Sequence, residues 1–556
     1  MKCMDKIMNI KQRNIKVTGM LLFYLFTFLP LSAQYDVVPL PQQITVKQGD
    51  GFMLNADVHI WAADGLEREA AFLQTYLAEL TGLQLPISTQ KQRKVQYIEL
   101  SVSPKVTATE GYVLTVSKQG VSIKGGSAAG VFYGIQTLRK ALNAQHSPLT
   151  TTHHSPLTTH QIELPPVEIS DAPRFSYRGM HLDCSRHFFS ISFIKKYINL
   201  LALHNMNVFH WHLSDDQGWR IEMKKWKRLT EVGSQRSGTI IGCNSDLDDH
   251  TPYGGYYTQD EAREIVAYAK ERHITVIPEI DMPGHMLAAL ASYPELGCTG
   301  GPYQVGHYWG VYKDVLCIAN PKVYQFVEDV LTELMDIFPS EVIHIGGDET
   351  PTEKWEACPK CQALGLPKEQ LQSYFTQRVF DILTRNGRRT FGWDEILEGS
   401  PQDAIIMSWR GTEPGAKAAN EGHDVVMAPT THCYFDYQQT EDPLFEPSRC
   451  GGCITVEKVY SLEPVPEGIS DEARRHILGV QANLWAEYIT SEELAEYQAL
   501  PRMSALSEVQ WTQPERKDYA AFCQRLTRLT DLFELEHYVY AKHLWPERTL
   551  KNRWQF

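Results

Sequence analysis

Two things are scarce in this chain of 556 residues: long apolar runs and an excess of positive charge. After the run from Met20 to Leu31 no comparable apolar stretch appears, so we expect no stable membrane span in the mature protein. Lys and Arg number 53 against 67 Asp and Glu, which gives a formal net charge of -14. A chain this acidic is not expected to bind nucleic acid through a basic face.

Residues 1–33 are typical of a secretory signal. Five basic residues precede the apolar run, which ends in Leu31-Ser32-Ala33, a small-residue site for cleavage before Gln34. The segment holds five Lys or Arg and one Asp, a charge of +4, so its removal changes the net charge from -14 to -18. No cysteine follows the run, which argues against a lipid anchor, and an uncleaved anchor is the alternative. We expect an exported protein, periplasmic or extracellular.

Ten cysteines remain beyond residue 33, and an exported chain can pair some of them. Cys298 and Cys317 could close a loop. Cys358 and Cys361, in the sequence Cys-Pro-Lys-Cys, could form a local disulfide, supply half of a zinc site or remain as two thiols. With zinc left as the alternative at these cysteines, we predict no metal and no cofactor for this chain.

Between Arg174 and Trp511, strand patterns alternate with helix patterns. Apolar residues at helical spacing follow Ile194, a capping box begins at Thr258, and another helix begins at Asn320-Pro321. The candidate strands are 179–183, 208–213, 275–280, 342–345, 389–393, 405–409, 424–428 and 477–482. Because parallel strands need helical crossovers and eight strands close a barrel, the pattern predicts an α/β fold, a (β/α)8 TIM barrel. A doubly wound open sheet is the alternative fold.

The barrel is predicted to span residues 170–515. Residues 34–165 mix short strands with a clear helix, which indicates a small α+β domain. An amphipathic helix from Lys517 to Leu535 predicts a helical extension, 516–556, that packs back on the barrel. The segment His-Ser-Pro-Leu-Thr-Thr occurs at 146–151 and again at 154–159, and we expect an exposed loop or linker there.

The stretch Glu-Val-Ile-His-Ile-Gly-Gly-Asp-Glu-Thr, residues 341–350, predicts a buried strand that ends in a site. On a regular strand Asp348 and Glu349 would face opposite ways. Both can enter one pocket only if the strand has already ended, and the paired glycines Gly346 and Gly347 permit such a bend. An acidic turn after a core strand is the alternative.

Polar and aromatic residues gather where the other predicted strands end, which is where barrel enzymes place their active sites. Three tryptophans among carboxylates, an arginine and a histidine describe a pocket with apolar walls and many hydrogen-bonding groups, which suits a sugar. A phosphate ligand would favour glycine-rich loops and basic residues. A metal hydrolase is the alternative, although it leaves the tryptophans without a role. Its ligands would be His210, His212, Asp215, Asp281 and His285.

Three motifs carry a resemblance to a known family. His344-Ile-Gly-Gly-Asp-Glu349, Leu213-Ser-Asp-Asp-Gln-Gly-Trp-Arg220 and Ile280-Asp-Met-Pro-Gly-His285 together resemble family 20 glycoside hydrolases, the β-N-acetylhexosaminidases. The resemblance covers the barrel from about Tyr177 to Trp511, and the segment before it is similar to the small non-catalytic domain of these enzymes.

The resemblance implies an exo-acting, retaining β-N-acetylhexosaminidase whose partner is a glycan with a terminal β-linked GlcNAc or GalNAc. The nucleophile would be the substrate's own 2-acetamido group, an exception to the usual two-carboxylate scheme. A relative that releases a disaccharide such as lacto-N-biose and a catalytically silent glycan-binding barrel are the alternatives.

The same resemblance implies a role for each matching residue. Glu349 would be the general acid and base, Asp348 would hold the acetamido group, and Tyr434 would hydrogen-bond the acetamido oxygen. Asp215 and His285, together with Asp281, would orient Glu349, whose pKa would have to be raised for it to hold a proton. The residues that would bind the sugar hydroxyls are Arg186, Asp436 and Glu487. The tryptophans that would line the subsite are Trp393, Trp409 and Trp485.

Overall fold

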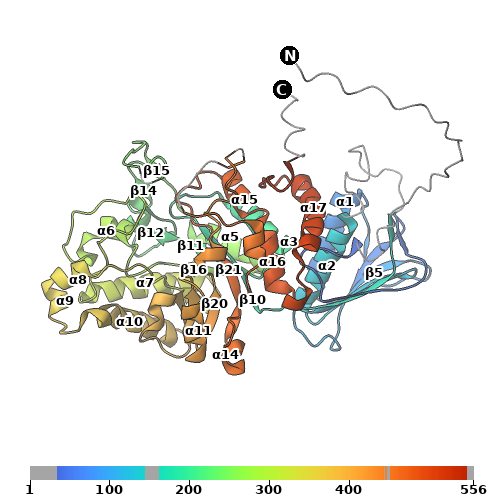
Figure 1. Ribbon diagram of the computed structural model, residues 1–556, viewed down its shortest axis with the longest axis horizontal. Coiled ribbons are helices and arrows are strands. Elements are labelled where there is room, and N and C mark those ends of the chain that lie inside the picture. The colour runs from blue at the N-terminus through green and yellow to red at the C-terminus, as the bar shows by residue number, and fades with distance from the viewer. Residues whose placement is uncertain (1–33, 144–161, 244, 444, 447–450, 547–556) are drawn as a thin grey trace, which may run out of the picture.

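The computed structural model describes residues 34–143, 162–243, 245–443, 445–446 and 451–546 (Figure 1). The predicted signal segment, the duplicated segment at 146–159 and Cys450 lie outside these residues. None of the helices in the described ranges combines the length and the apolar character that crossing a bilayer requires.

Eight parallel strands form a closed barrel, and the first strand pairs with both the second and the last. The strands are β10 (Tyr177–Asp183), β11 (Val208–His212), β16 (Thr275–Glu279), β17 (Val342–His344), β18 (Arg389–Trp393), β19 (Ile405–Ser408), β20 (Asp424–Met427) and β21 (Ile477–Ala482). Every predicted strand is present within a residue or two of its predicted ends. The prediction of a (β/α)8 barrel is therefore confirmed, and the open sheet is wrong.

Helices cover the outside of the barrel, so strands such as β10 and β11 are buried at every position. The main covering helices are α3 (Ile191–Leu203), α5 (Gln259–Lys270), α7 (Pro321–Ile337), α10 (Leu371–Arg385), α11 (Glu413–Asn420), α15 (Glu492–Ala499) and α16 (Arg502–Trp511). Several of these helices begin at residues whose side chains cap the first backbone N–H groups. Thr258 and Glu261 form the predicted capping box of α5, and the side chain of Asn320 caps α7 before Pro321.

The connections at the carboxyl ends of the strands are long and carry short elements of their own. The segment after β11 contains β12 (Ser214–Asp215), β13 (Gly218–Trp219), α4 (Arg228–Glu231), β14 (Gln235–Arg236) and β15 (Tyr253–Gly254). The segments after β16, β17 and β20 contain α6 (Leu287–Ser292), η2 (Pro294–Leu296), α8 (Glu353–Ala357), α9 (Pro359–Gln362), η3 (Lys368–Gln370), α12 (Thr430–Cys433), α13 (Val456–Tyr460) and α14 (Asp471–Arg475). Between β18 and β19 only the short η4 (Asp394–Leu397) intervenes. These loops build the rim on which the predicted site residues lie.

The small domain is built on a seven-stranded sheet in the order β1-β9-β6-β7-β5-β3-β4. Its strands are β1 (Gln43–Val46), β3 (His59–Ala62), β4 (Ile87–Ser88), β5 (Tyr97–Val102), β6 (Tyr112–Ser117), β7 (Gly120–Gly125) and β9 (Val167–Asp171), and β2 (Phe52–Leu54) pairs separately with β8 (Ile162–Leu164). Two helices, α1 (Glu67–Thr81) and α2 (Ala128–Asn143), pack on this sheet (Figure 1). Helix α2 is buried all round from Gly130 onward because it lies between the sheet and the rest of the molecule.

The two domains meet through specific polar contacts. Arg178 of β10 donates two hydrogen bonds of 2.8 Å to the carboxylate of Glu110, a bidentate pair across the boundary. Helix α17 (Tyr519–Leu535) lies beside α2, where Asn143 Nδ2 donates to the carbonyl of Arg528 at 2.8 Å (Figure 1). The same helix is joined to α16 by Arg525 and Glu508. It therefore contacts both the small domain and the barrel's outer layer.

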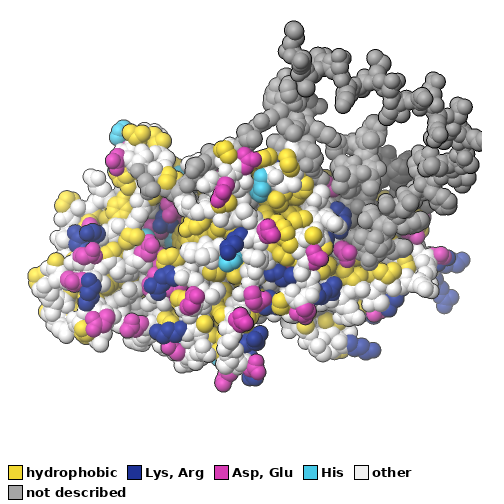
Figure 2. Space-filling view, in the orientation of Figure 1, with side chains coloured by type: hydrophobic (Ala, Val, Ile, Leu, Met, Phe, Trp, Pro, Cys, Tyr) yellow, Lys and Arg dark blue, Asp and Glu magenta, His cyan; other side chains and the backbone are white. Residues whose placement is uncertain are grey.

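Acidic and basic side chains are interspersed over the face of the molecule that Figure 2 shows, without a continuous basic area.

Candidate active site

Strand β17 ends at His344, and the chain then bends through two glycines in left-handed backbone conformations. Gly346 has φ of 66° and Gly347 has φ of 95°. A Cβ on Gly346 would lie 1.8 Å from a carboxylate oxygen of Asp281, so only glycine fits. The bend that the sequence predicts is present. Glu349 itself has φ of 45°, a strained conformation of the kind that clusters at functional sites.

The bend brings Asp348 and Glu349 to the same histidine. His285 Nε2 lies 3.8 Å from Asp348 Oδ2 and 3.6 Å from Glu349 Oε2. The side chain of Asp348 is 13% exposed and that of Glu349 is 42% exposed, so the second carboxylate is the one that reaches outward. Both carboxylates therefore lie on one side of the site, and the alternative of a simple acidic turn does not describe them.

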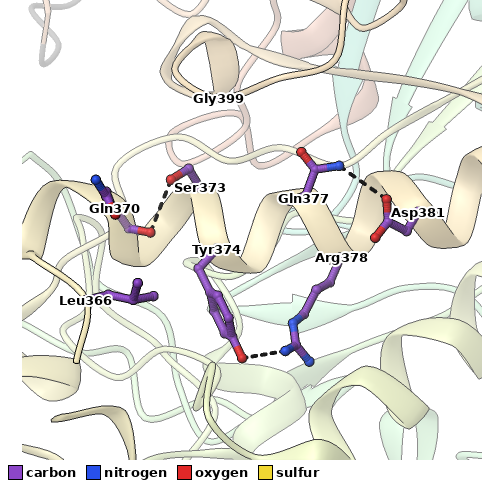
Figure 3. A pocket seen from close by; sticks show the side chains of 8 residues that line it. All are labelled: Leu366, Gln370, Ser373, Tyr374, Gln377, Arg378, Asp381 and Gly399. Carbon is purple, nitrogen blue, oxygen red and sulfur yellow. Dashed lines mark hydrogen bonds between the residues drawn. The ribbon is translucent and has the colours of Figure 1, made fainter. Parts of the chain in front are cut away.

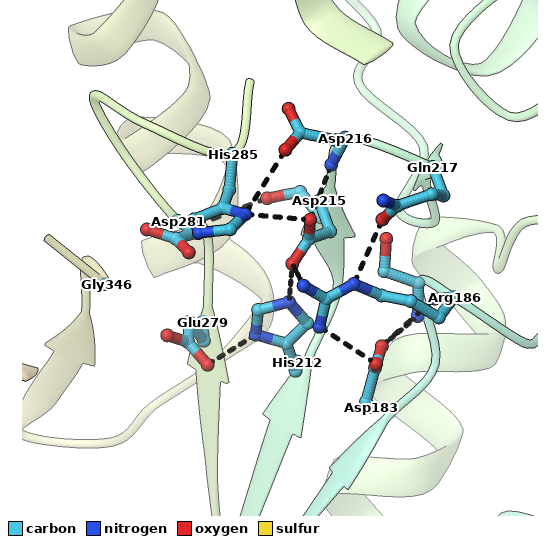
Figure 4. Close-up of polar contacts among 12 residues, drawn as sticks. Asp183, Arg186, His212, Asp215, Asp216, Gln217, Glu279, Asp281, His285 and Gly346 are labelled. Carbon is cyan, nitrogen blue, oxygen red and sulfur yellow. Dashed lines mark hydrogen bonds and ion pairs between the residues drawn. The ribbon is translucent and has the colours of Figure 1, made fainter. Parts of the chain in front are cut away.

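A chain of buried ionic contacts continues behind His285 (Figure 4). His285 Nδ1 lies 3.1 Å from Asp215 Oδ1 and 3.3 Å from Asp216 Oδ2. The other oxygen of Asp215 contacts His212 Nε2 at 3.0 Å and Arg186 Nη2 at 2.8 Å. The predicted grouping of Asp215 with His285 is thus present in the structure, and Arg186 belongs to the same network.

These contacts set the charges of the network. Burial raises the pKa of Asp215, but the neighbouring Arg186 and His285 outweigh it and hold that pKa well below its usual range. Burial opposes protonation of His285, yet the charge of Asp215 and the polar contacts with Asp215, Asp216 and Glu349 raise its pKa well above the usual value. His285 is therefore a cation that faces both Asp348 and Glu349.

The expectation of a raised pKa for Glu349 is not met in this structure. The polar contact with His285 lowers the pKa of Glu349, and its effect outweighs the partial burial of the carboxyl. The physical reason is the cationic His285, whose charge could not be inferred from the motif alone. A glycan that covered the carboxyl and excluded water would act in the opposite direction, toward the protonated form.

Asp348 and Asp281 form a second coupled pair of carboxyls. Burial and the neighbouring Asp348 raise the pKa of Asp281 well above its usual range. Burial also raises the pKa of Asp348, an effect that His285 opposes. Asp281 is held in place by the backbone N–H of Gly347, which donates to it at 3.1 Å. The upward shift of the pKa is larger for Asp281 than for Asp348, so a proton shared by the pair is favoured on Asp281.

Glu279, at the end of β16, contacts several side chains inside the barrel. It was not among the predicted site residues. His212 Nδ1, Trp393 Nε1 and His344 Nδ1 lie 2.6, 2.9 and 2.9 Å from its carboxylate oxygens. His212, which contacts Glu279, also contacts Asp215. The hydrogen bond from Trp393 to Glu279 fixes the orientation of the indole ring. A glutamate at the end of a predicted strand was the available signal, but the sequence could not show that side chains from three other strands converge on it.

The three predicted tryptophans line one wall with Tyr434. Trp393 and Trp485 have ring centroids 5.7 Å apart, and Trp409 stacks on Tyr434 at 6.2 Å with an interplanar angle of 25°. Trp409 Nε1 donates to Glu395 at 2.9 Å. Burial and the nearby charge of Asp348 raise the pKa of Glu395 to about 8, which favours the protonated carboxyl at pH 7. Glu395 is a second residue that the sequence prediction missed.

The predicted hydroxyl-binding residues lie beside this wall. The guanidinium of Arg186 lies 5.2 Å from the ring centroid of Trp485, and its Nη1 lies 3.9 Å from Glu487 Oε1. Burial and the neighbouring charge of Glu487 raise the pKa of Asp436 well above its usual range. Asp436 Oδ1 and Asp348 Oδ1 are buried without a hydrogen-bond partner among the described residues. Buried acceptors of this kind are expected where a ligand supplies the donors.

A separate pocket of about 480 Å³ lies on the outer side of α10 (Figure 3). Its lining includes Leu366, Tyr374 and Arg378, and Arg378 donates to the hydroxyl of Tyr374 at 2.5 Å. None of the predicted site residues lines this pocket. The strand-end cluster, with its coupled charges and aromatic wall, is therefore the candidate active site.

Comparison with known proteins identifies the class. The model for "Glycosyl hydrolase family 20, catalytic domain" matches residues 175–514, and the model for "Glycosyl hydrolase family 20, domain 2" matches residues 34–172. The chain belongs to glycosyl hydrolase family 20, as the three motifs indicated.

Relatives with known names agree with this assignment. A β-hexosaminidase of Porphyromonas gingivalis is 43% identical over 500 residues, which cover 88% of this chain and 62% of that protein. One from Vibrio furnissii is 34% identical and covers 86% of this chain and 76% of its own length. The chain thus spans about three fifths to three quarters of these two relatives.

Solved structures show the same fold. The exo-β-N-acetylglucosaminidase of Vibrio harveyi, crystallised in complex with N-acetylglucosamine, has a TM-score of 0.80 at 33% identity and covers 92% of this chain and 79% of its own. The N-acetyl-β-hexosaminidase of Streptomyces plicatus has a TM-score of 0.76 at 31% identity and covers 92% of this chain and 96% of its own.

Proposed function

We propose that this chain is an exo-acting, retaining β-N-acetylhexosaminidase that removes terminal GlcNAc or GalNAc from glycans by substrate-assisted catalysis. The observation that carries the proposal is the placement of Asp348 and Glu349 around one cationic histidine. Together with His285 they place one nitrogen and two carboxylate oxygens within 4.8 Å of one another. Carboxylates that flank a sugar in ordinary retaining enzymes stand about 5 to 5.5 Å apart on opposite sides of the scissile bond.

Glu349 is the acid and base of this mechanism. Its side chain is the outermost of the pair and approaches His285, and the bound glycan would shift it toward the protonated form by desolvation. It gives its proton to the leaving oxygen and then accepts one from the attacking water. His285, held by Asp215, keeps the carboxyl in position and stabilises its anion after the first proton transfer.

Asp348 is assigned to the acetamido group. Because the pKa of Asp281 is raised more than that of Asp348, Asp348 is the member of the pair that would present a carboxylate to accept the acetamido N–H and polarise the carbonyl oxygen toward the anomeric carbon. Its unpartnered, buried Oδ1 is available for that contact. Holding an internal nucleophile in attacking position supplies several kcal/mol of barrier reduction. Tyr434 would support the acetamido oxygen as charge develops on the ring that forms.

The aromatic wall and the charged residues beside it fit the remainder of the sugar. Trp393, Trp409 and Trp485 supply apolar faces for the pyranose ring and the acetamido methyl group. Arg186, Asp436 and Glu487 supply the hydrogen bonds that its 3-, 4- and 6-hydroxyls require. The proposal also includes export to the periplasm or beyond, on the basis of the signal pattern in residues 1–33.

Turnover of two matched aryl glycosides tests the proposal. The aryl β-N-acetylglucosaminide should be hydrolysed with retention of the anomeric configuration, and the aryl β-glucoside with a 2-hydroxyl should be turned over negligibly. Hydrolysis of both substrates at similar rates would overturn the mechanism. Binding of the first without turnover would favour a silent glycan-binding barrel, and release of lacto-N-biose from a longer glycan would favour the disaccharide-releasing relative.

A further inference from the structure

Four cysteines from two separate loops meet outside the active site. Cys298 follows η2 and Cys317 precedes α7, whereas Cys358 and Cys361 bracket the start of α9. All four sulfur atoms lie within 4.8 Å of one another. Cys317 Sγ is 3.7 Å from Cys361 Sγ, and Cys298 Sγ is 4.0 Å from the same atom. Three of the four side chains are buried, and Cys298 is partly buried.

These separations fit a tetrahedral metal site. Four sulfurs bound to one zinc ion at about 2.3 Å each lie about 3.8 Å from one another in a regular tetrahedron. The observed 3.7 and 4.0 Å agree with that value. Disulfide sulfurs lie about 2.05 Å apart, so the two measured pairs are not disulfides. The structure leaves all four as thiols, whereas Cys243 is disulfide-bonded.

We propose that Cys298, Cys317, Cys358 and Cys361 bind one Zn²⁺ as a closed, structural tetrathiolate site. Four protein ligands leave no open position for a water or a substrate, which distinguishes this site from a catalytic zinc centre. The proposal changes the interpretation of the Cys358-Pro-Lys-Cys361 motif, whose spacing suits two ligands but whose partners the sequence could not identify. It adds a metal to a chain for which none was expected, although away from the reacting groups.

The site would join the two loops that carry the acid and base machinery. Leu316, next to Cys317, donates its N–H to the carbonyl of Pro283 at 3.1 Å, two residues before His285. The carbonyl of Leu316 accepts a hydrogen bond of 2.8 Å from Trp355 Nε1, which lies in the segment that follows Glu349. Cys317 N donates to Leu296 O at 2.8 Å. A zinc ion here would tie the loop after β16 to the loop after β17, and so fix His285 relative to Glu349.

Metal analysis of the full-length protein tests the proposal. The protein is purified without chelator and desalted, and elemental mass spectrometry should then find one zinc per chain. Substitutions Cys317→Ser and Cys361→Ser should each lower the zinc content to well below one per chain. Cys523→Ser, which changes a cysteine of α17 outside the cluster, should retain it.

Two further measurements do not depend on how the variants fold. Removal of zinc from the unmodified protein should lower its melting temperature, and replacement by Co²⁺ should give the charge-transfer and ligand-field bands of a tetrahedral cobalt thiolate. Unmodified protein that contains no metal, or peptide mapping that finds Cys298, Cys317, Cys358 or Cys361 in disulfides, would overturn the proposal. So would zinc that persists at one per chain in Cys361→Ser, or iron in place of zinc.

Discussion

The barrel and the small domain both bury charge, but they arrange it differently. In the barrel, Asp215, Glu279 and His285 are fully or almost fully buried, and His212 links Glu279 to the contact between Asp215 and His285. In the small domain, strands such as β7 and β9 alternate buried and outward positions. Its buried Asp171 lies where the domains meet and accepts hydrogen bonds from Tyr112 and Trp511. The buried charge of the barrel thus belongs to the candidate active site, and the buried charge of Asp171 joins the two domains.

The largest expected effect comes from Glu349→Gln, which keeps the shape of the side chain and removes its transferable proton. We expect kcat to fall by roughly 10²- to 10⁴-fold on a substrate with a poor leaving group. An activated aryl leaving group needs little protonation, so its loss should be much smaller. Steady-state kinetics on the two substrates measures the difference. Equal losses on both would point to another acid.

Asp348→Asn should reduce turnover and inhibitor binding together. A thiazoline that mimics the cyclised intermediate should bind the unmodified protein far more tightly than the product does, because it resembles the reacting state. The substitution should weaken thiazoline binding by roughly the factor by which it lowers kcat/KM, since one interaction serves both. Full thiazoline affinity in a variant with little turnover would show that Asp348 has a different role.

His285→Gln should move the pH dependence of kcat/KM, with a smaller loss of maximal rate. The cationic His285 lowers the pKa of Glu349, so its replacement by a neutral side chain removes that effect and raises the pKa. An acid with a raised pKa stays protonated to higher pH, and the basic limb of the profile should therefore move to higher pH. Profiles of the two proteins measured side by side provide the test. A basic limb that stays in place or moves to lower pH would contradict the assigned charge.

Glu110→Gln, at the domain boundary, should change stability and leave kcat unchanged. It breaks the bidentate pair with Arg178, whose side chain is 1% exposed, at a cost of about 1 to 3 kcal/mol in the free energy of unfolding. Burial raises the pKa of Glu110, but Arg178 outweighs it and the net pKa is lowered from 4.5.

The pair therefore stabilises the fold above pH 4.5, and this contribution is lost as the pH falls through the lower folded-state pKa. Denaturant unfolding at pH 7 and at pH 3 should show a smaller difference between the two pH values in the variant. The exposed pair of Lys118 and Asp50, broken by Lys118→Ala, is the control and should change little. A change in kcat with unaltered stability would contradict the claim that Glu110 stabilises the domain boundary and takes no part in catalysis.

The fold was predictable because its signals are local. Apolar β-branched runs mark the barrel strands, and the capping residues at Thr258 and Asn320 mark helix starts in the sequence itself. The site was predictable where motifs follow strand ends, as at Asp348 and Glu349. Glu279, the lowered pKa of Glu349 and the partners of Cys358 depend on which strands and loops become neighbours after the barrel closes. No spacing in the sequence encodes those neighbours.

The most direct test of the central claim is a series of aryl glycosides in which the 2-acetamido methyl group carries none to three fluorine atoms. Fluorine withdraws electrons from the acetamido oxygen and weakens it as a nucleophile, while the leaving group and the pyranose remain the same. If the acetamido group attacks the anomeric carbon, log kcat/KM should fall steeply with each added fluorine. A flat series, or a covalent glycosyl adduct trapped on Asp348, would contradict substrate-assisted catalysis by this chain.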